Sequence, residues 1–310
     1  MVGPTCSGKS ALAVELAKIY GGEIISCDSM QVYRGMDIGT AKITEKEKQG
    51  IPHHLIDIVE PTGKFSCADY VCAAKEKINE ISGKGKIPIF CGGTGLYLNS
   101  AIEIKNLSAA PADGELRKKL EEKPPDELYR MLSGTDPDSA AKIHPNNVRR
   151  VIRAIEIYML TGKTKTEWDA ESKTPVSPYR NVRICLDFRN RENLYSLIDK
   201  RTEAMFGAGL VNEVRNLDCE EFRKSTASEG IGYKEVLMYL DGRITYDEAV
   251  EAVKKASRNY AKRQLTWFRA EKDLHRIFVD EFPQPNGIGK FEFIVNSAVN
   301  IINSSLNMVY

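Results

Sequence analysis

The stretch Gly3-Pro4-Thr5-Cys6-Ser7-Gly8-Lys9-Ser10 matches the phosphate-binding pattern G-x-x-x-x-G-K-[ST] and opens directly into a helix-forming run. In such loops the glycines let backbone N–H groups curl around phosphate oxygens, the lysine reaches the distal phosphates, and the positive end of the helix points at them. Residues 10–18 are mostly good helix formers, with Leu12 and Leu16 on one apolar face. Alone, the pattern indicates a nucleotide site such as an ATP site; a plain glycine-rich turn is the alternative.

Length, charge and cysteine content bound the class of protein. A chain of 310 residues is expected to form one large domain or a core with an insertion. The formal net charge of +1 gives no global attraction to nucleic acid, so any basic surface must be local. The seven cysteines include no C-x-x-C pair, which favours free thiols in a reducing cytosol, and no apolar run is long enough to cross a bilayer. We therefore expect a cytoplasmic protein without a membrane partner.

Two strand-like segments end beside residues that could form a site. Residues 23–27 indicate a short strand that stops at Asp28, and residues 86–91 indicate a second strand that runs into the glycine turn 92–95. The helical stretch 67–81 lies between them, so the strands should pair in parallel. Ligands bind beyond the carboxyl ends of such strands, where Asp28 and the glycine turn would both lie. The predicted fold class is α/β, with a P-loop NTPase-like parallel sheet core and a helical insertion domain.

The sequence pattern changes after residue 110, where charged sequence typical of helices replaces the strand pattern. Strand-like sequence returns at 182–188, and Thr245-Tyr246-Asp247-Glu248 is a capping box that starts a helix reaching about Glu271. A terminal helix is expected over 290–303. The predicted organisation is 1–110 for the first part of the core, 111–180 for the helical insertion, 181–280 for the second part of the core with a basic helix, and 281–310 for a C-terminal tail.

Two of the predicted helices carry basic faces. In the first, apolar residues at positions 148, 151, 152 and 155 form a stripe that leaves Arg149, Arg150 and Arg153 on the opposite side. In the second, no acidic residue occurs from 253 to 270. A solvated helix usually mixes charges of both signs, so contact with phosphates is one reason for a single-sign surface. A solvated face is the alternative reading of the arginine trio, and Gln264, Trp267 and Phe268 could touch bases or belong to the core.

Taken together, these motifs resemble the tRNA dimethylallyltransferase family in its bacterial form, over nearly the whole chain up to about Arg269. The blocks that carry the resemblance are G-P-T-C-S-G-K-S from Gly3, D-S-M-Q-V-Y-R-G-M-D-I-G-T-A-K from Asp28, G-G-T-G-L-Y from Gly92, H-P-N-N-V-R-R-V-I-R-A-I-E from His144, G-I-G-Y-K-E from Gly230 and A-K-R-Q-L-T-W-F-R from Ala261. Two features depart from the family pattern. The apolar central strand that usually precedes the phosphate loop is reduced to Met1-Val2, and Glu229 stands where glutamine or arginine is expected near the tRNA.

The resemblance implies a prenyl transfer from dimethylallyl diphosphate to N6 of the adenosine 3′-adjacent to the anticodon, in tRNAs that read codons beginning with U. The phosphate loop would hold the diphosphate, with Lys9 stabilising the leaving group and Ser10 turning its hydroxyl toward Mg²⁺. Thr94 would bind the same group, and Asp28 would accept a proton from the adenine amine or orient it. An amine this weak needs an acceptor close by, and an allylic diphosphate ionises when its charge is neutralised.

The acceptor base must be turned outward to reach such a site, so the resemblance assigns the basic faces to the anticodon stem-loop. A monomer is expected to bind it. The residues implied in tRNA binding are Asp28, Ser29, Met30, Gln31, Thr94, Arg117, Arg149, Arg150, Val151, Ile152, Arg153, Ala252, Val253, Lys254, Lys255, Ala256, Ser257, Arg258, Lys262 and Arg263.

Three other functions compete with this interpretation. A small-molecule P-loop kinase would need ATP but no long basic helix. An adenylate isopentenyltransferase would run the same chemistry on a free nucleotide. The helical region and the block from Ala261 favour tRNA over both. A non-enzymatic RNA-binding protein with a degenerate nucleotide site is disfavoured by the intact Lys9, Ser10, Asp28 and Thr94.

Overall fold

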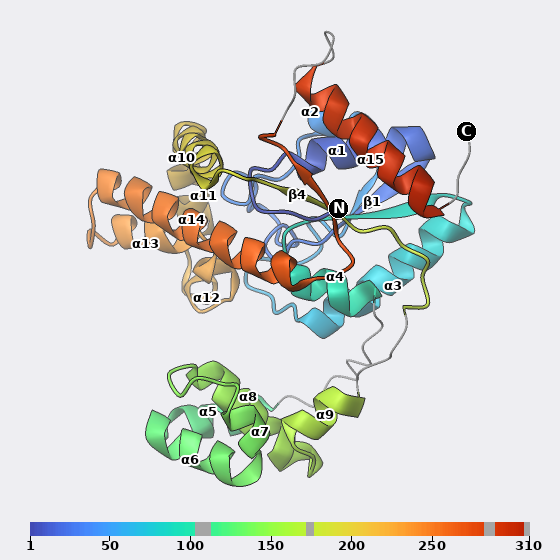
Figure 1. Cartoon of the computed structure of the whole chain (residues 1–310). Helices are drawn as coiled ribbons and strands as arrows, with labels where there is room; N and C mark the ends of the chain where they lie inside the picture. The colour runs from blue at the N-terminus through green and yellow to red at the C-terminus, as the bar shows by residue number, and fades with distance from the viewer. Residues whose placement is uncertain (103–112, 172–176, 282–288, 307–310) are drawn as a thin grey trace. The chain divides into compact units, whose positions relative to one another are not determined.

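The computed structural model describes residues 1–102, 113–171, 177–281 and 289–306, so parts of the predicted insertion and tail lie outside the described residues (Figure 1). The helices are α1 (Lys9–Tyr20), α2 (Glu45–Lys48), α3 (Cys67–Gly83), α4 (Gly95–Ile102), α5 (Gly114–Glu121), α6 (Pro125–Thr135), α7 (Pro137–Ala140), α8 (Val148–Thr161), α9 (Lys165–Glu171), α10 (Arg191–Gly207), α11 (Leu210–Leu217), α12 (Glu220–Arg223), α13 (Tyr233–Leu240), α14 (Tyr246–Ala270) and α15 (Lys290–Leu306), with a 3₁₀ turn at Ala227–Glu229. The strands are β1 (Gly22–Ser26), β2 (His53–His54), β3 (Ile87–Cys91), β4 (Ile184–Asp187) and β5 (His275–Phe278).

The chain divides into two compact units. One combines Met1–Leu98 with Arg180–Tyr310, and the other is Asn99–Tyr179. Helices α5 to α9 of the second unit all fall within the predicted insertion, 111–180. We call the first the sheet unit and the second the helical unit. Among the described helices, none is both long and apolar enough to cross a membrane.

All strand pairs in the sheet unit are parallel. One group has the order β2-β1-β3, and β4 pairs with β5. Val2 joins the two groups, because it bridges to Gly92 beside β3 and to Cys185 in β4. Its N–H donates to the carbonyl of Ile184 at 2.8 Å, and its carbonyl accepts from the N–H of Leu186 at 3.0 Å. Val2 is therefore a single bridging residue between the two groups of a parallel sheet, at the place where the central strand is expected.

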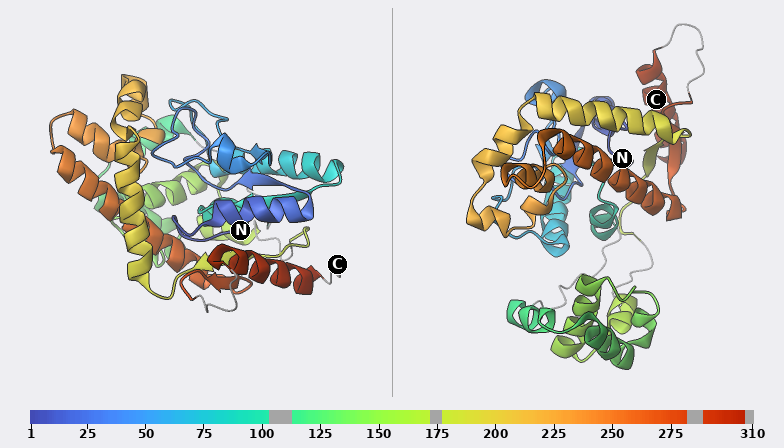
Figure 2. Two further views of the ribbon diagram at one scale, coloured as in Figure 1. Left: turned by 90° about the horizontal axis from the view of Figure 1, so that it is seen from above. Right: turned by 90° about the vertical axis from the view of Figure 1, so that its left-hand side faces the viewer.

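Helices cover both faces of the sheet. Helix α1 contacts β1 and β3 on one face with α15 beside it, and α3 contacts the same strands on the opposite face (Figures 1 and 2). Leu12 and Leu16 of α1 are buried against Ile24 and Leu186, as the predicted apolar face requires. The predicted strands at 23–27, 86–91 and 182–188 are confirmed to within two residues at either end.

Helices α10, α11, α13 and α14 form a second layer in the sheet unit. Helix α14 packs against α10 and α13 (Figure 2). It begins at the predicted capping box, where the Thr245 hydroxyl accepts a hydrogen bond from the N–H of Glu248 and the Glu248 carboxylate accepts one from the N–H of Thr245. The strands β2 and β5 were not predicted, because β2 has only two residues and β5 begins with the polar pair His275-Arg276.

The helical unit has its own core, which Leu128, Leu132, Val151 and Ile155 help to form. Val151 and Ile152 are 1% and 4% exposed. The sequence names both residues among those implied in tRNA binding. Their side chains belong to the apolar stripe of α8 and pack into the core of the unit.

Candidate functional site

The phosphate loop has the backbone shape that its glycines allow. Gly8 adopts φ 82° as the N-cap of α1, and Gly3 lies so close to the sheet that a Cβ would stand 2.5 Å from the carbonyl oxygen of Leu186. The ammonium of Lys9 folds back over the loop and donates to the carbonyl of Pro4 at 3.2 Å. Burial lowers the pKa of Lys9. An anion in the loop would offset that cost of desolvation.

Ser7 gives a second sign that the loop is built for a ligand. Its side chain is 6% exposed, and its hydroxyl has no hydrogen-bond partner among the described residues. A buried polar group without a partner costs free energy, so such a group in a native site points to a ligand or water that satisfies it. The hydroxyl belongs to the turn where phosphate oxygens bind in loops of this pattern.

A cavity of about 310 Å³ opens at the carboxyl ends of the strands in the sheet unit. It brings together the phosphate loop, the segment after β1 and the inner face of α14. The lining residues predicted from sequence are Thr5, Cys6, Lys9, Ser10, Asp28, Ser29, Met30, Gln31, Val253, Ser257 and Arg263. Residues separated by more than 200 positions thus meet in one cavity.

Asp28 is held by a turn of its own backbone. Its Oδ1 accepts hydrogen bonds from the N–H groups of Met30 at 2.9 Å and Gln31 at 3.3 Å. These bonds fix the carboxylate at the end of β1. Within the described residues Oδ2 has no hydrogen-bond partner, so it can accept a proton from a bound substrate.

Thr94 is linked to the residue that follows Asp28. Its hydroxyl oxygen accepts the N–H of Ser29 at 3.2 Å, which links the glycine turn after β3 to the segment after β1. Tyr260 of α14 lines the cavity beside them. Burial, together with the charge of Asp28, raises the pKa of Tyr260 to about 12, so its hydroxyl stays protonated as a hydrogen-bond donor.

Sequence reasoning missed two residues of this site. Gln264 is buried, and its Oε1 accepts the N–H of Thr5 at 2.9 Å while its Nε2 donates to the carbonyl of Gly93 at 3.1 Å. It was expected either to touch bases or to belong to the core. Instead it supports the two loops. Arg201 of α10 donates to the hydroxyl of Thr5 at 2.5 Å and adds a positive charge at the loop. Nothing in the local sequence distinguishes this arginine from its charged neighbours.

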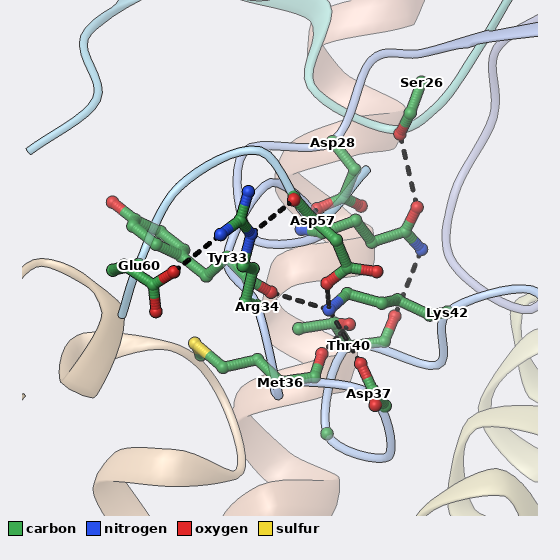
Figure 3. A network of polar contacts seen from close by, with 12 residues as sticks. Ser26, Asp28, Tyr33, Arg34, Met36, Asp37, Thr40, Lys42, Asp57 and Glu60 are labelled. Atoms are coloured by element: carbon green, nitrogen blue, oxygen red, sulfur yellow. Dashed lines mark hydrogen bonds and ion pairs between the residues drawn. The ribbon is translucent and has the colours of Figure 1, made fainter. Parts of the chain in front are cut away.

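The segment that follows Asp28 is pinned by a polar network (Figure 3). The ammonium of Lys42 donates to the carbonyl of Tyr33 at 2.6 Å and pairs with the carboxylates of Asp37 and Asp57. The side chain of Lys42 is 6% exposed. A buried cation with three acceptors is well satisfied, so it stabilises one conformation of this segment.

The basic surface of α14 is less uniform than its sequence indicates. Lys254 pairs with Glu203 at 2.8 Å, and Arg258 pairs with Asp199 at 2.5 Å, both on α10. These two counter-charges come from a neighbouring helix, which a reading of α14 alone could not include, whereas Lys254 also pairs with Glu251 of α14 itself at 2.9 Å. Three exposed cations, Lys255, Lys262 and Arg263, have no ion-pair partner within the described ranges.

A similar division holds in the helical unit. The carboxylate of Glu156 is fully buried and pairs with Arg117 at 2.9 Å and Arg153 at 2.5 Å. Part of the role of these two arginines is therefore to neutralise a buried carboxylate within the fold. Arg149 and Arg150 are exposed, and no ion pair holds either of them in the part of the chain that the structure describes.

The remaining polar residues give no metal site. Among the described residues, no group of three His, Cys, Asp or Glu could hold a metal ion. His54 pairs with the buried Glu23 at 2.7 Å at the amino end of β1, and within the described residues no two cysteines form a disulfide. Glu229 lines the mouth of the cavity and pairs with Lys234 at 2.7 Å, so its charge is partly neutralised.

Comparisons with known proteins agree with this geometry. The family model of IPP transferase matches residues 31–271. A tRNA dimethylallyltransferase of Thermoanaerobacter sp. (strain X514) is 49% identical over 288 residues, which cover 91% of either chain. One from Anoxybacillus flavithermus is 50% identical over 269 residues, covering 87% of this chain and 86% of the relative.

Solved structures give the same result. The tRNA isopentenylpyrophosphate transferase of Bacillus halodurans is 43% identical, superposes with a TM-score of 0.72 and is matched over 99% of this chain and 96% of its own. A eukaryotic dimethylallyltransferase acting on tRNA is 30% identical with a TM-score of 0.82, over 97% of this chain and 78% of its own. With the family model covering well over half of the residues, the chain belongs to the IPP transferase family.

Proposed function

We propose that the protein transfers a dimethylallyl group from dimethylallyl diphosphate to N6 of the adenosine 3′-adjacent to the anticodon, in tRNAs that read codons beginning with U. We assign the core to the P-loop NTPase-like class and place the reaction in the cytoplasm. One observation carries the proposal: the phosphate loop and the carboxylate of Asp28 face the same cavity of about 310 Å³. That arrangement suits a diphosphate leaving group at one end and a proton-losing nucleophile at the other.

On the donor side, the residues of the loop would neutralise the leaving group. Lys9, Arg201 and the first N–H groups of α1 supply positive charge, and the unpartnered hydroxyl of Ser7 supplies one more donor. As the bond between the allylic carbon and the diphosphate oxygen breaks, the electron pair stays on the diphosphate. Preorganised donors stabilise that developing charge without further rearrangement.

On the acceptor side, N6 of adenine would attack the allylic carbon and lose one proton. The free Oδ2 of Asp28 is the acceptor for that proton, because Oδ1 is already used by two backbone N–H groups. Ser29, Met30 and Gln31 line the cavity next to it and would hold the base. The base can enter only after it leaves the stack of the anticodon loop.

The residues present fit a Mg²⁺ ion carried mainly by the substrate. Mg²⁺ commonly uses one or two protein oxygens and takes the rest from phosphates and water. Ser10 lines the cavity at the start of α1 and would supply the protein oxygen. When bound, the ion would add positive charge beside the diphosphate. We also propose that Arg149, Arg150, Lys255, Lys262 and Arg263, which are exposed, grip the anticodon stem-loop of one tRNA per monomer.

The test is transfer of radiolabel from dimethylallyl diphosphate to a tRNA transcript with an A-A-A run in its anticodon loop. A transcript with guanosine at the acceptor position is the matched control. We expect label in the first transcript alone. Label in free AMP but not in tRNA would assign the protein to the adenylate isopentenyltransferases, and consumption of ATP with a small-molecule acceptor would assign it to the kinases.

A further inference from the structure

Glu213 of α11 makes an unusual set of contacts outside the cavity. Its Oε2 accepts hydrogen bonds from the backbone N–H groups of Asp37 at 2.9 Å and Ile38 at 2.7 Å. Its Oε1 accepts the N–H of Gly39 at 3.0 Å and the hydroxyl of Tyr233 at 2.6 Å. One carboxylate therefore binds three successive backbone N–H groups and a phenol. Successive N–H groups that converge in this way form an anion-binding concavity, and here the anion is supplied by the chain itself.

The segment that Glu213 holds forms one wall of the cavity. Gly39, Thr40 and Ala41 line it, whereas Glu213 does not. The carbonyl of Thr40 accepts a hydrogen bond from Nε2 of Gln31 at 3.3 Å, and Oε1 of Gln31 accepts the hydroxyl of Ser26 at 3.2 Å. Glu213 therefore acts on the cavity indirectly, through the segment that it holds. It fixes the backbone at 37–39, and the next residue of that segment orients the Gln31 amide.

The packing leaves this segment little freedom. A Cβ on Gly39 would stand 2.5 Å from the ring of Tyr233, so the backbone lies directly on that ring. Tyr233 is fully buried, and its hydroxyl points at Glu213. Burial and the neighbouring Glu213 carboxylate raise the pKa of Tyr233, so the phenol remains a donor. Lys42 follows the segment, and its ammonium folds back to pair with Asp37 at 2.7 Å.

We propose that Glu213 is a positioning residue for the acceptor: it sets the wall formed by Gly39, Thr40 and Ala41 and, through Thr40, the amide of Gln31 that faces the base. The donor end of the cavity shares no contact with Glu213, since the phosphate loop is held by Gln264 and Arg201. Loss of Glu213 should therefore weaken the use of the RNA acceptor and leave the use of dimethylallyl diphosphate nearly unchanged. This inference rests on the proposed function for its kinetic part only.

The experiment compares Glu213→Ala and Glu213→Gln with Glu220→Gln, which changes an exposed glutamate on the neighbouring α12 whose carboxylate pairs with Lys224. We expect Glu213→Ala to raise KM for the anticodon stem-loop about tenfold while KM for dimethylallyl diphosphate changes less than about twofold. Glu213→Gln should fall between, because its amide keeps one acceptor oxygen but loses the other. The control should behave as wild type.

Two measurements that need no activity accompany the kinetics. Amide hydrogen exchange at Ile38 and Gly39 should accelerate in both Glu213 variants, and the Kd for the stem-loop, measured by fluorescence anisotropy, should rise with KM. Equal rises of KM for the stem-loop and KM for dimethylallyl diphosphate would overturn the inference. So would a Glu213→Gln variant whose amide exchange and Kd both match those of wild type. If Glu213→Ala does not fold, Glu213→Gln decides the question. If the wild-type protein shows no prenyl transfer, the proposed function is refuted. Amide exchange and the Kd for the stem-loop would still decide the role of Glu213.

Discussion

The side-chain oxygen of Gln264 accepts a hydrogen bond from the backbone N–H of Thr5 at 2.9 Å, which ties the basic helix α14 to the phosphate loop. The amide nitrogen of the same side chain donates to the carbonyl of Gly93, so one residue holds the loop and the glycine turn together. A Cβ on Gly93 would stand 2.1 Å from that nitrogen, which explains why the turn carries glycine there.

Replacing Gln264 by alanine should lower kcat/KM about tenfold or more, because a partly buried N–H and a buried carbonyl both lose their partner, at a cost of about 1–3 kcal/mol each. Gln264→Glu should be partly active, since it keeps the acceptor for Thr5 but lacks the donor for Gly93. Steady-state kinetics measure kcat/KM for both variants. Thr266→Ala, exposed on the same helix, is the control. Wild-type kcat/KM in Gln264→Ala would show that the bridge does not matter for turnover.

Asp28→Asn should reduce kcat by roughly 10²–10⁴-fold while the Kd for tRNA stays near that of wild type. The asparagine oxygen can still accept the N–H groups of Met30 and Gln31, so the turn survives and only the proton acceptor is lost. Single-turnover transfer and a filter-binding Kd separate these effects. Asp247→Asn on the first turn of α14 serves as the control. A large loss of tRNA affinity would instead make Asp28 a recognition residue.

Ser7→Ala should leave the free energy of unfolding unchanged or slightly higher, because the hydroxyl that is removed has no partner in the described structure. The same change should raise KM for dimethylallyl diphosphate about five- to tenfold if the hydroxyl contacts the diphosphate. Urea unfolding and donor titration measure the two quantities. Lower stability with an unchanged KM would show that Ser7 serves the fold of the loop and not the ligand.

Arg149→Ala combined with Arg150→Ala should weaken tRNA binding and reduce the slope of log Kd against log salt concentration by about 1–2. Both side chains are exposed, so the double variant should fold normally. Lys46→Ala with Lys64→Ala, two exposed lysines of the sheet unit, controls for net charge. An unchanged salt slope would return this face of α8 to an ordinary solvated surface.

Glu156→Gln should destabilise the protein by about 1–3 kcal/mol at neutral pH, since Arg117 and Arg153 lose a buried counter-charge but remain partly solvated. Burial alone would raise the pKa of Glu156, yet hydrogen bonds from Arg117, Arg153 and the N–H of Asp113 outweigh it and hold the pKa below its usual value. The stabilisation is therefore present above the unfolded pKa and is lost as the pH falls through the folded one. Urea unfolding across that range should show the difference between wild type and variant shrinking toward acid pH. A constant difference would contradict this assignment.

Much of the site could be predicted because its signals are local. A glycine pattern followed by a helix, a strand that stops at Asp28 and a capping box at Thr245 each need fewer than about ten residues of context. Their shared position at one edge of the sheet follows from parallel pairing, which is a general rule of α/β folds. Only the structure shows that Val2 hydrogen-bonds to β4 and Met1 to Phe90 of β3.

The remaining features depend on contacts between distant parts of the chain. Gln264 meets Thr5 across 259 positions, and Glu213 meets Gly39 across 174, so no local pattern marks either. The sequence by itself predicted the phosphate-loop pattern, the strands β1, β3 and β4 and the helices α1, α3 and α14, because backbone propensity and periodicity are short-range properties. Only the tertiary structure decided which charges are free. Glu203 and Asp199 of α10 neutralise part of α14, and Glu156 of α8 pairs with Arg117 of α5, so such pairing depends on which helices pack together.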